Sequence, residues 1–289
     1  MTPEPEVPEH QAEAPVKGAR QTPRISVVIV SLDRVDNLRA SIESLGPDHQ
    51  IAVVDNGSTD GSETLNVEFP HLHFSRLPRN FGLVKALNIG LRSAEGEYIL
   101  CLHDDARVTG GDVSRLADYL ESHPDAGVVS PLLVDPSGAP VPQARALPSP
   151  GEPDPALRLP GDAEEESVAC VSGAAIMFRS FFLRSLRHVD EHYGTYGASI
   201  EICAKVRSAA KKVVILHSVT AIHENEPSPV PRGMLAGDRA AGTAVFLGKH
   251  HGFMSGLLYR IKTALAALFT FRFSVLNGAI SGQKIDGTG

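Results

Sequence analysis

The sequence predicts an α/β fold with a mostly parallel sheet flanked by helices. Runs of β-branched and aliphatic residues alternate with segments of helical spacing, beginning with a strand at 25–30, a helix at 35–45 and a strand at 51–54. A strand without polar alternation is typical of a sheet that is covered on both faces. Strand–helix–strand order favours parallel neighbours joined by right-handed crossovers.

The alternation continues to residue 223. Further strands are expected at 71–75, 98–102, 127–134, 168–179, 212–217 and 221–223, and helices at 81–93, 113–122, 181–186 and 199–210. The segment 136–167 holds eight prolines, so we expect a long irregular loop there. One domain is predicted over residues 24–226, after a disordered Pro- and Glu-rich lead at 1–23.

Composition excludes several function classes. The 289-residue chain carries a net charge of −7, so it lacks the basic field that attracts nucleic acid, and we expect no nucleic-acid partner. Cys101, Cys170 and Cys203 form no CxxC pair, which indicates reduced thiols in a cytosol. The first twenty residues have no apolar core of a signal peptide, and no apolar run is long enough to span a membrane. We therefore expect a cytoplasmic protein.

Carboxylates follow two of the predicted strands. Asp55 ends the strand in VVDNGSTDGS, and the strand 98–102 runs directly into His103, Asp104 and Asp105. Ligands of open α/β sheets bind at the carboxyl ends of the strands. Adjacent carboxylates repel, and a cation such as Mg²⁺ or Mn²⁺ holds them together while leaving positions for phosphate oxygens. Alone, an Asp-Asn-Gly turn or an Asp-Asp helix cap is ordinary structure.

Between these motifs lies RNFGLVKALNIG, in which Gly82 opens a helix. The N-terminus of that helix is suited to bind phosphate, and Lys85 in its first turn adds a positive charge. No GxGxxG follows the first strand, which argues against an NAD-linked oxidoreductase. The same missing Gly-rich loop argues against a sugar nucleotidyltransferase.

The ordered set VVIVSLDR, VVDNGSTDGS, RNFGLVKALNIGLRSAEGEYIL and LHDDA resembles glycosyltransferase family 2, and particularly its bacterial rhamnosyltransferase-like branch. The likeness continues through VSGAAIMFR, VDEHYGTYG and VILHSVTAIHE, so it covers about residues 24–224, and KHHG at 249–252 also occurs in that branch. It implies a GT-A fold and inverting, metal-assisted transfer from a nucleoside-diphosphate sugar, either UDP- or dTDP-linked. The acceptor is expected to be a glycan or a lipid-linked molecule.

The resemblance also implies roles for individual residues. Asp105 and His223 are expected to bind the metal, and Gly173 and Ala174 to form the turn on the acceptor side. Contacts with the donor nucleotide are expected from Ser31, Asp33, Asp55, Asn80, Gly82, Lys85 and Asp104.

Two departures from the family pattern affect the chemistry. The aspartate that usually opens the metal motif is His103, and the usual Glu-Asp pair of the later motif is Ala198-Ser199. In inverting transfer that missing Asp is the expected general base, and losing a base typically costs about 10²–10⁴ in rate. Glu201 and Asp190 are the predicted substitutes, although Glu201 points about 200° away from Ser199 on a helix.

Three interpretations of this departure stay open: a displaced base, an acceptor that is already ionised, and a pseudo-enzyme that binds nucleotide sugar or a partner without turnover. The pseudo-enzyme is the alternative to a glycosyltransferase.

The last segment, 227–289, differs in charge from the rest of the chain. From Phe246 onward it holds five Lys or Arg residues and one acid, Asp286. Together with apolar residues between Leu257 and Phe269, this composition predicts a helical tail that contacts an anionic membrane peripherally, at the inner face of the cell membrane. The simpler alternative is a helix packed on the catalytic domain.

Overall fold

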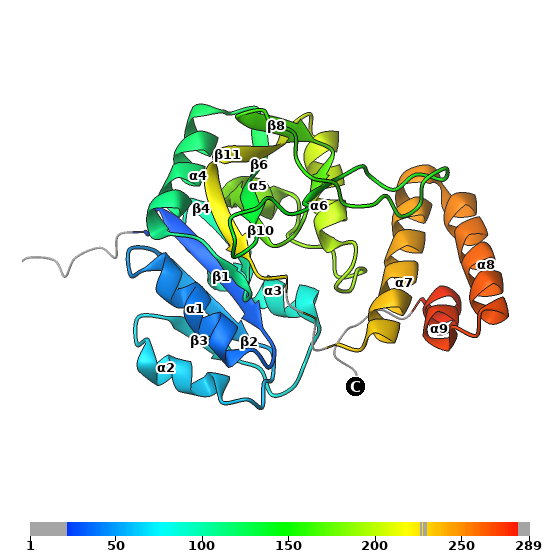
Figure 1. Ribbon diagram of the computed structural model, residues 1–289, viewed down its shortest axis with the longest axis horizontal. Helices are drawn as coiled ribbons and strands as arrows, with labels where there is room; N and C mark the ends of the chain where they lie inside the picture. The colour runs from blue at the N-terminus through cyan, green and yellow to red at the C-terminus, as the bar shows by residue number, and fades with distance from the viewer. Residues whose placement is uncertain (1–21, 226, 228–229, 283–289) are drawn as a thin grey trace, which may run out of the picture.

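The computed structural model describes residues 22–225, 227 and 230–282, which form a helix-flanked sheet and a helical bundle beside it (Figure 1). The sheet has nine strands in the order β3-β2-β1-β4-β10-β6-β11-β5, and β8 pairs with β11. Most of the lead predicted at 1–23 lies outside the described residues, as do Lys284 and Asp286 of the predicted tail.

The first half of the sheet is parallel. In chain order, its strands and the helices that connect them are β1 (Ile25–Ser31), α1 (Val35–Leu45), β2 (Gln50–Asp55), the short η1 (Ser62–Thr64) and α2 (Leu65–Glu68), β3 (His73–Arg76), α3 (Leu83–Ser93) and β4 (Tyr98–His103). β1 lies between β2 and β4 and is parallel to both. Because the chain moves outward to β3 and then returns to the other side of β1, the strand order reverses at β1 and β4, where such sheets bind ligands.

The second half is mixed. It contains β5 (Ala106–Arg107), α4 (Gly110–Ser122), β6 (Ala126–Val134), β8 (Glu165–Val168), β10 (Ala175–Arg179), α5 (Ser180–Ser185), α6 (Ala198–Ser208) and β11 (Lys212–His223). β10 is antiparallel to both of its neighbours, β4 and β6. β11 is one long strand with an irregularity between Leu216 and Thr220, whereas the sequence predicted two pieces there.

Alternating side chains of the strands enter two cores. Val27 and Ile29 pack in one core with Leu38 of α1, while Val28 packs in the other with Val84 of α3. α3 approaches the sheet closely, because a Cβ added at Gly90 would lie 2.5 Å from Val28 Cγ1. The predicted α/β class with a mostly parallel, helix-flanked sheet is therefore confirmed.

The predicted loop at 136–167 has some regular structure. β7 (Ala144–Arg145) pairs with β9 (Cys170–Val171), and β8 joins the main sheet. Asp154 in this loop accepts a hydrogen bond from Tyr196 and pairs with Arg239. The loop therefore connects the sheet domain to the bundle.

The bundle consists of α7 (Arg232–His251), α8 (Phe253–Phe269) and α9 (Phe273–Ser281), with α7 nearest the sheet domain (Figure 1). Glycines allow close packing: a Cβ added at Gly278 would clash with Gly237, and one added at Gly256 would lie 2.9 Å from the Cα of Gly248. No helix among the described residues is long and apolar enough to cross a membrane.

Candidate active site

The carboxyl ends of β1, β2 and β4 bring several of the predicted site residues to one edge of the sheet. Ser31 is in register with Asp55, and Val30 is in register with His103. The turn after β4 then places Asp104 and Asp105 beside the end of β1. Sequence order alone predicted this edge, and the register confirms that these three strand ends are neighbours.

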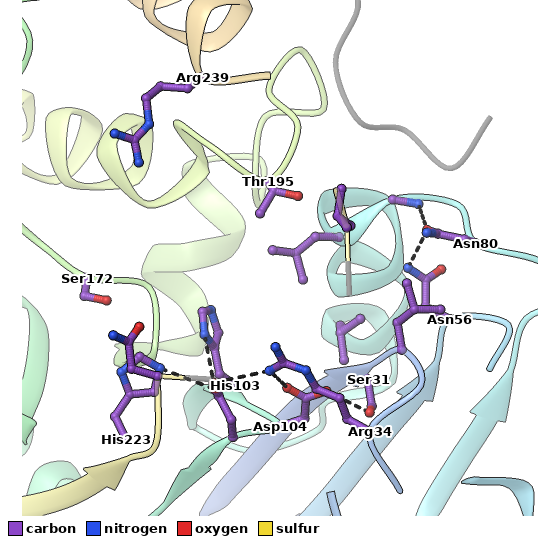
Figure 2. A pocket seen from close by; sticks show the side chains of 17 residues that line it. Ser31, Arg34, Asn56, Asn80, His103, Asp104, Ser172, Thr195, His223 and Arg239 are labelled. Atoms are coloured by element: carbon purple, nitrogen blue, oxygen red, sulfur yellow. Dashed lines mark hydrogen bonds and ion pairs between the residues drawn. The ribbon is translucent and has the colours of Figure 1, made fainter. Parts of the chain in front are cut away.

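Asp104 is held by groups from the end of β1. Its Oδ2 accepts a hydrogen bond of 2.8 Å from the Ser31 hydroxyl, and its Oδ1 lies 3.3 Å from an Arg34 nitrogen (Figure 2). The same Arg34 nitrogen lies 3.2 Å from Asp105 Oδ2. Burial raises the pKa of Asp104, while Ser31 and Arg34 act in the opposite direction. Sequence reasoning missed Arg34, although it directly follows the predicted Asp33.

Asp105 lies between two histidines. β5 pairs with the end of β11, with Ala106 opposite His223, so the last residue of β11 comes beside Asp105. His223 Nε2 is 3.3 Å and His103 Nδ1 is 3.9 Å from Asp105 Oδ1. One ligand atom from each of the three residues lies within 4.8 Å of the others. Two imidazoles and a carboxylate in this arrangement are a suitable donor set for a divalent metal.

The pKa values in this cluster follow from burial and mutual charge. Burial alone disfavours the charged form of Asp105, but the hydrogen bond from His223 and the nearby His103 and Arg34 outweigh it and lower its pKa to about 2. Burial lowers the pKa of His103 to about 4, and Asp105 offsets only part of that shift. Around pH 7 the pair is thus a carboxylate beside a neutral imidazole, the forms in which both bind metals.

A cleft of about 440 Å³ opens above these residues (Figure 2). Ser31, Arg34, Asp104, Asp105 and His223 line one part of it, and the rest includes Asn56, Asn80, Gly82, Ser172, Thr195 and Arg239. Arg239 comes from α7, so the bundle contributes to the wall of the cleft. The volume falls within the range of small-molecule sites.

Asp33 and Asp55 organise the turn after β2 and do not line this cleft. Asp55 is fully buried, and its Oδ1 accepts the amide of Ser58, while Arg76 Nε lies 3.4 Å from its Oδ2. Asp33 accepts the amide of Thr59 at 2.7 Å. A shallow hollow lined by 57–59 and 76–78 adjoins this turn. The predicted nucleotide contacts of Asp33 and Asp55 stay predictions, and Arg76 is a further candidate that the sequence did not single out.

Asn80 and Gly82 line the cleft at the start of α3. Asn80 Oδ1 accepts hydrogen bonds from the Asn56 side chain and from the Gly82 amide, which fixes the loop that enters the helix. Gly82 has φ of 83°, a conformation that favours glycine. Lys85 is partly buried on α3 and is not among the described residues that line the cleft. Its predicted contact with the donor stays a prediction.

Gly173 and Ala174 lie next to His103, and their predicted role as a turn on the acceptor side stays a prediction. The Ala174 carbonyl accepts the His103 amide at 2.8 Å. A Cβ added at Gly173 would lie 3.5 Å from the Ser199 Cβ and 3.7 Å from His103 Nε2. A mostly apolar cavity of about 140 Å³ continues from the cleft past His103, Gly173, Ala198 and Ser199. Ser199 thus faces the site from the start of α6.

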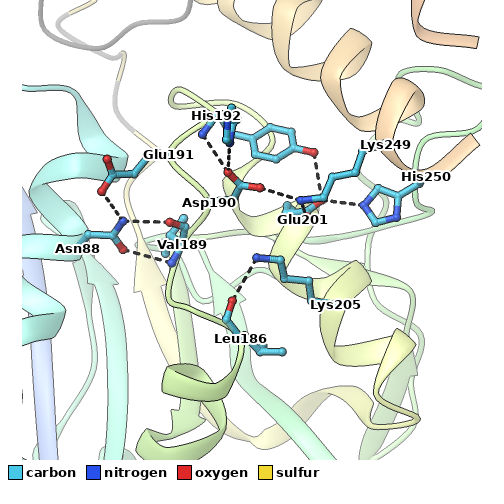
Figure 3. Close-up of polar contacts among 11 residues, drawn as sticks. Asn88, Leu186, Val189, Asp190, Glu191, His192, Glu201, Lys205, Lys249 and His250 are labelled. Carbon is cyan, nitrogen blue, oxygen red and sulfur yellow. Dashed lines mark hydrogen bonds and ion pairs between the residues drawn. The ribbon is translucent and has the colours of Figure 1, made fainter. Parts of the chain in front are cut away.

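Glu201 and Asp190 lie in a different cluster, between α6 and α7 (Figure 3). Glu201 is fully buried and lies 2.7 Å from both Lys249 Nζ and His250 Nε2, and it accepts a 3.0 Å hydrogen bond from Tyr193. Asp190 lies 2.7 Å from Lys249 Nζ. Neither carboxylate lines the cleft or the adjoining cavity. This placement does not support the predicted role of either residue as the base. For Glu201 the physical reason is the helical rotation from Ser199, and Asp190 is held by its ion pair with Lys249.

Comparison with known proteins identifies the family. The model of glycosyl transferase family 2 matches residues 26–186, more than half of the chain. The chain belongs to glycosyl transferase family 2. It is 24% identical over 261 residues to an N-acetylglucosaminyl-diphospho-decaprenol L-rhamnosyltransferase of Mycobacterium tuberculosis, which covers 79% of this chain and 84% of that relative. The family and the rhamnosyltransferase-like branch expected from the motifs are thus confirmed.

Solved structures confirm the GT-A fold. A mannosyltransferase from Pyrobaculum calidifontis in complex with GDP-Man and Mn²⁺ has a TM-score of 0.55 at 16% identity, covering 93% of this chain and 77% of that one. GalNAc-T7 with UDP, GalNAc and Mn²⁺ has a TM-score of 0.58 at 15% identity, covering 78% of this chain. This chain spans about half of the GalNAc-T7 chain, 48%. The family 2 protein described here is therefore a glycosyltransferase with a GT-A fold.

Proposed function

We propose that this glycosyltransferase transfers a sugar, with inversion, from a UDP- or dTDP-linked donor to a lipid-linked or glycan acceptor at the cytoplasmic face of the cell membrane. The observation that carries the proposal is the cluster of His103, Asp105 and His223 at the edge of a cleft whose wall includes Ser31 and Asp104. The diphospho-decaprenol substrate in the name of the mycobacterial relative supports a lipid-linked acceptor.

The donor set favours Mn²⁺ over Mg²⁺. Magnesium prefers oxygen ligands in octahedral geometry, whereas Mn²⁺ also accepts imidazole nitrogen, which two of the three candidate ligands offer. When bound, the ion would counter the charge that develops on the leaving diphosphate. His103, Asp105 and His223 would hold it. Arg34 lies at the same edge, and its guanidinium is suited to bind phosphate oxygens in addition to the two carboxylates.

The acceptor hydroxyl must lose a proton when it attacks. Ser199 faces the cavity beside His103, at the helix start where family members usually carry the aspartate base. A serine hydroxyl is too weak a base at neutral pH. We keep Asp190 and Glu201 as proposed bases only for a conformation in which their ion pairs with Lys249 are broken. The position of Ser199 is also the observation that favours the second candidate, a pseudo-enzyme that binds nucleotide sugar without turnover.

Donor calorimetry and sugar-release assays test the proposal together. We expect one UDP- or dTDP-sugar to bind in the presence of Mn²⁺, with affinity lowered about tenfold or more by a chelator. We also expect measurable release of sugar with lipid-linked acceptors. The variant Ser199→Asp supplies the missing carboxylate and is expected to raise the transfer rate about 10²-fold. Donor binding without release across a broad acceptor panel, in the wild type and in Ser199→Asp, would establish the pseudo-enzyme instead.

A further inference from the structure

The bundle carries an unusually apolar outer surface. Ten large apolar side chains of 253–280 are between 48% and 80% exposed: Phe253, Met254, Leu258, Ile261, Leu265, Leu268, Phe269, Phe271, Phe273 and Ile280. Scattered apolar residues are normal on a protein surface, but a contiguous patch marks a contact with another molecule or a membrane. We name these ten residues the apolar face.

Five of the seven members of the apolar face on α8 form one stripe. Met254, Leu258, Ile261, Leu265 and Leu268 are spaced alternately four and three residues apart, so they fall within about 80° of one another around the helix. The two buried residues of α8, Gly256 and Ala267, lie on the opposite side. There Gly256 packs against Gly248 of α7. The stripe therefore points away from the protein.

The charge of this surface has one sign. Residues 253–282 contain Arg260, Lys262 and Arg272 and no Asp or Glu, although the whole chain has 34 acids against 27 Lys and Arg. Lys262 borders the stripe, at about 80° from Met254 around α8. A second copy of this chain would be a poor occupant, because symmetric pairing along the stripe would bring Lys262 residues together with no acid to neutralise them. An anionic lipid surface neutralises the exposed Lys262 and Arg272 and accepts the apolar side chains.

We propose that α8 and α9 lie in the interface of an anionic membrane, with the apolar face inserted among the lipids. The inference rests on the proposed function, because the membrane at this face would be the surface from which the proposed lipid-linked acceptor enters. The bundle is fixed to the sheet domain, because Lys249 and His250 of α7 hold Glu201, and Asp238 accepts the amide of Tyr196. Arg239 of the same helix lines the cleft. Docking thus fixes the orientation of the cleft relative to the membrane.

Co-sedimentation of the full chain with vesicles tests this proposal without donor or acceptor. We expect binding to phosphatidylcholine vesicles that contain phosphatidylglycerol, and much weaker binding to phosphatidylcholine alone. The double variant Leu258→Ser/Leu265→Ser is expected to lower the affinity by about tenfold or more, because it removes two inserted side chains. A charge variant, Lys262→Gln, is expected to lower it by about fivefold, and only for the anionic vesicles.

The matched control is Val67→Ser/Phe181→Ser, which removes two similarly exposed apolar side chains from the sheet domain and should leave vesicle binding unchanged. Thermal unfolding and calorimetric donor binding of each variant show that the fold and the cleft are intact. They also separate a failure of this inference from a failure of the proposed function. The inference is overturned if the stripe variant binds vesicles like the wild type. It is also overturned if the wild type does not bind anionic vesicles and is instead a dimer in sedimentation, with Leu258→Ser/Leu265→Ser a monomer.

Discussion

Two buried acidic clusters in this protein use the same residue types for different purposes. In the cleft, Asp104 and Asp105 are grouped with Arg34 and two histidines. Between α6 and α7, Asp190 and Glu201 are grouped with Lys249 and His250. We call the first the cleft cluster and the second the anchor cluster. Both contain two carboxylates, one long cation and imidazole.

The difference lies in what the charged groups face. The carboxylates and histidines of the cleft cluster line an open volume of about 440 Å³, and three of its ligand atoms converge. In the anchor cluster the Glu201 carboxylate is fully buried, and Lys249, His250 and Tyr193 surround it. An acidic cluster with convergent atoms and access to a cleft is suited to bind a ligand, whereas one already neutralised by the protein joins two parts of the fold. The variants below test this distinction.

The largest expected effect is on catalysis, from a change in the cleft cluster. Asp105→Asn keeps the shape of the side chain but removes its charge, so the metal and the diphosphate lose a fixed electrostatic partner. We expect kcat to fall by about 10²–10³-fold, the usual loss when one transition-state electrostatic contact is removed. The free energy of unfolding should also fall at neutral pH, because the lowered pKa of Asp105 means that its folded surroundings stabilise the carboxylate. Steady-state kinetics and urea unfolding measure the two quantities.

The matched change in the anchor cluster is Glu201→Gln. It should leave activity per folded molecule nearly unchanged while lowering stability. The opposite pattern, a stable protein with kcat reduced as strongly as in Asp105→Asn, would make Glu201 the base after all and would remove the distinction between the clusters.

The sequence predicted the strands and helices whose buried residues follow a simple apolar spacing. The unbroken apolar runs became β1, β2 and β4, and the motif residues at their ends met at one edge, because parallel strand ends must lie together. One strand was predicted wrongly as two. β11 continues through residues 218–220, the gap between the two predicted pieces, since its register with β6 resumes at Thr220 after an irregularity.

Contacts between distant segments were not predictable in the same way. KHHG was noticed only as a motif, because nothing local to Lys249 or His250 indicates a partner 48 or 49 residues earlier in α6. Arg34 was missed for a similar reason, since an arginine after a strand has no pattern that points to carboxylates 70 residues later. The missing base was visible in the sequence, yet only the fold shows that Ser199 faces the cavity while Glu201 faces α7.

The next effect in size concerns stability. Lys249→Met removes the cation shared by Asp190 and Glu201, and leaves Glu201 buried with less compensation. We expect the free energy of unfolding to fall by about 3 kcal/mol, the lower end for breaking a buried ion pair, because His250 still contacts the carboxylate. Urea unfolding measures this loss. The double variant Lys249→Met/Glu201→Leu should recover part of it, since a buried apolar pair replaces the uncompensated charge. No recovery would mean that Lys249 acts through Asp190 alone.

The smallest expected effect is the acid sensitivity of the anchor cluster. Burial alone would raise the pKa of Asp190, but hydrogen bonds from Lys249 and His192 outweigh it and hold the pKa well below the ordinary value of about 4. A carboxyl group whose pKa is lower in the folded state stabilises the protein above its unfolded pKa, and that stability is lost as the pH falls further. Urea midpoints should therefore decline below about pH 4, and the decline should be shallower in Asp190→Asn. Lys249, whose pKa is raised above its ordinary value, stays protonated throughout that range, so the difference between the two curves belongs to Asp190. Equal slopes in the wild type and the variant would show that Asp190 gains nothing from Lys249, and would leave Glu201 as the carboxylate through which Lys249 stabilises the anchor cluster.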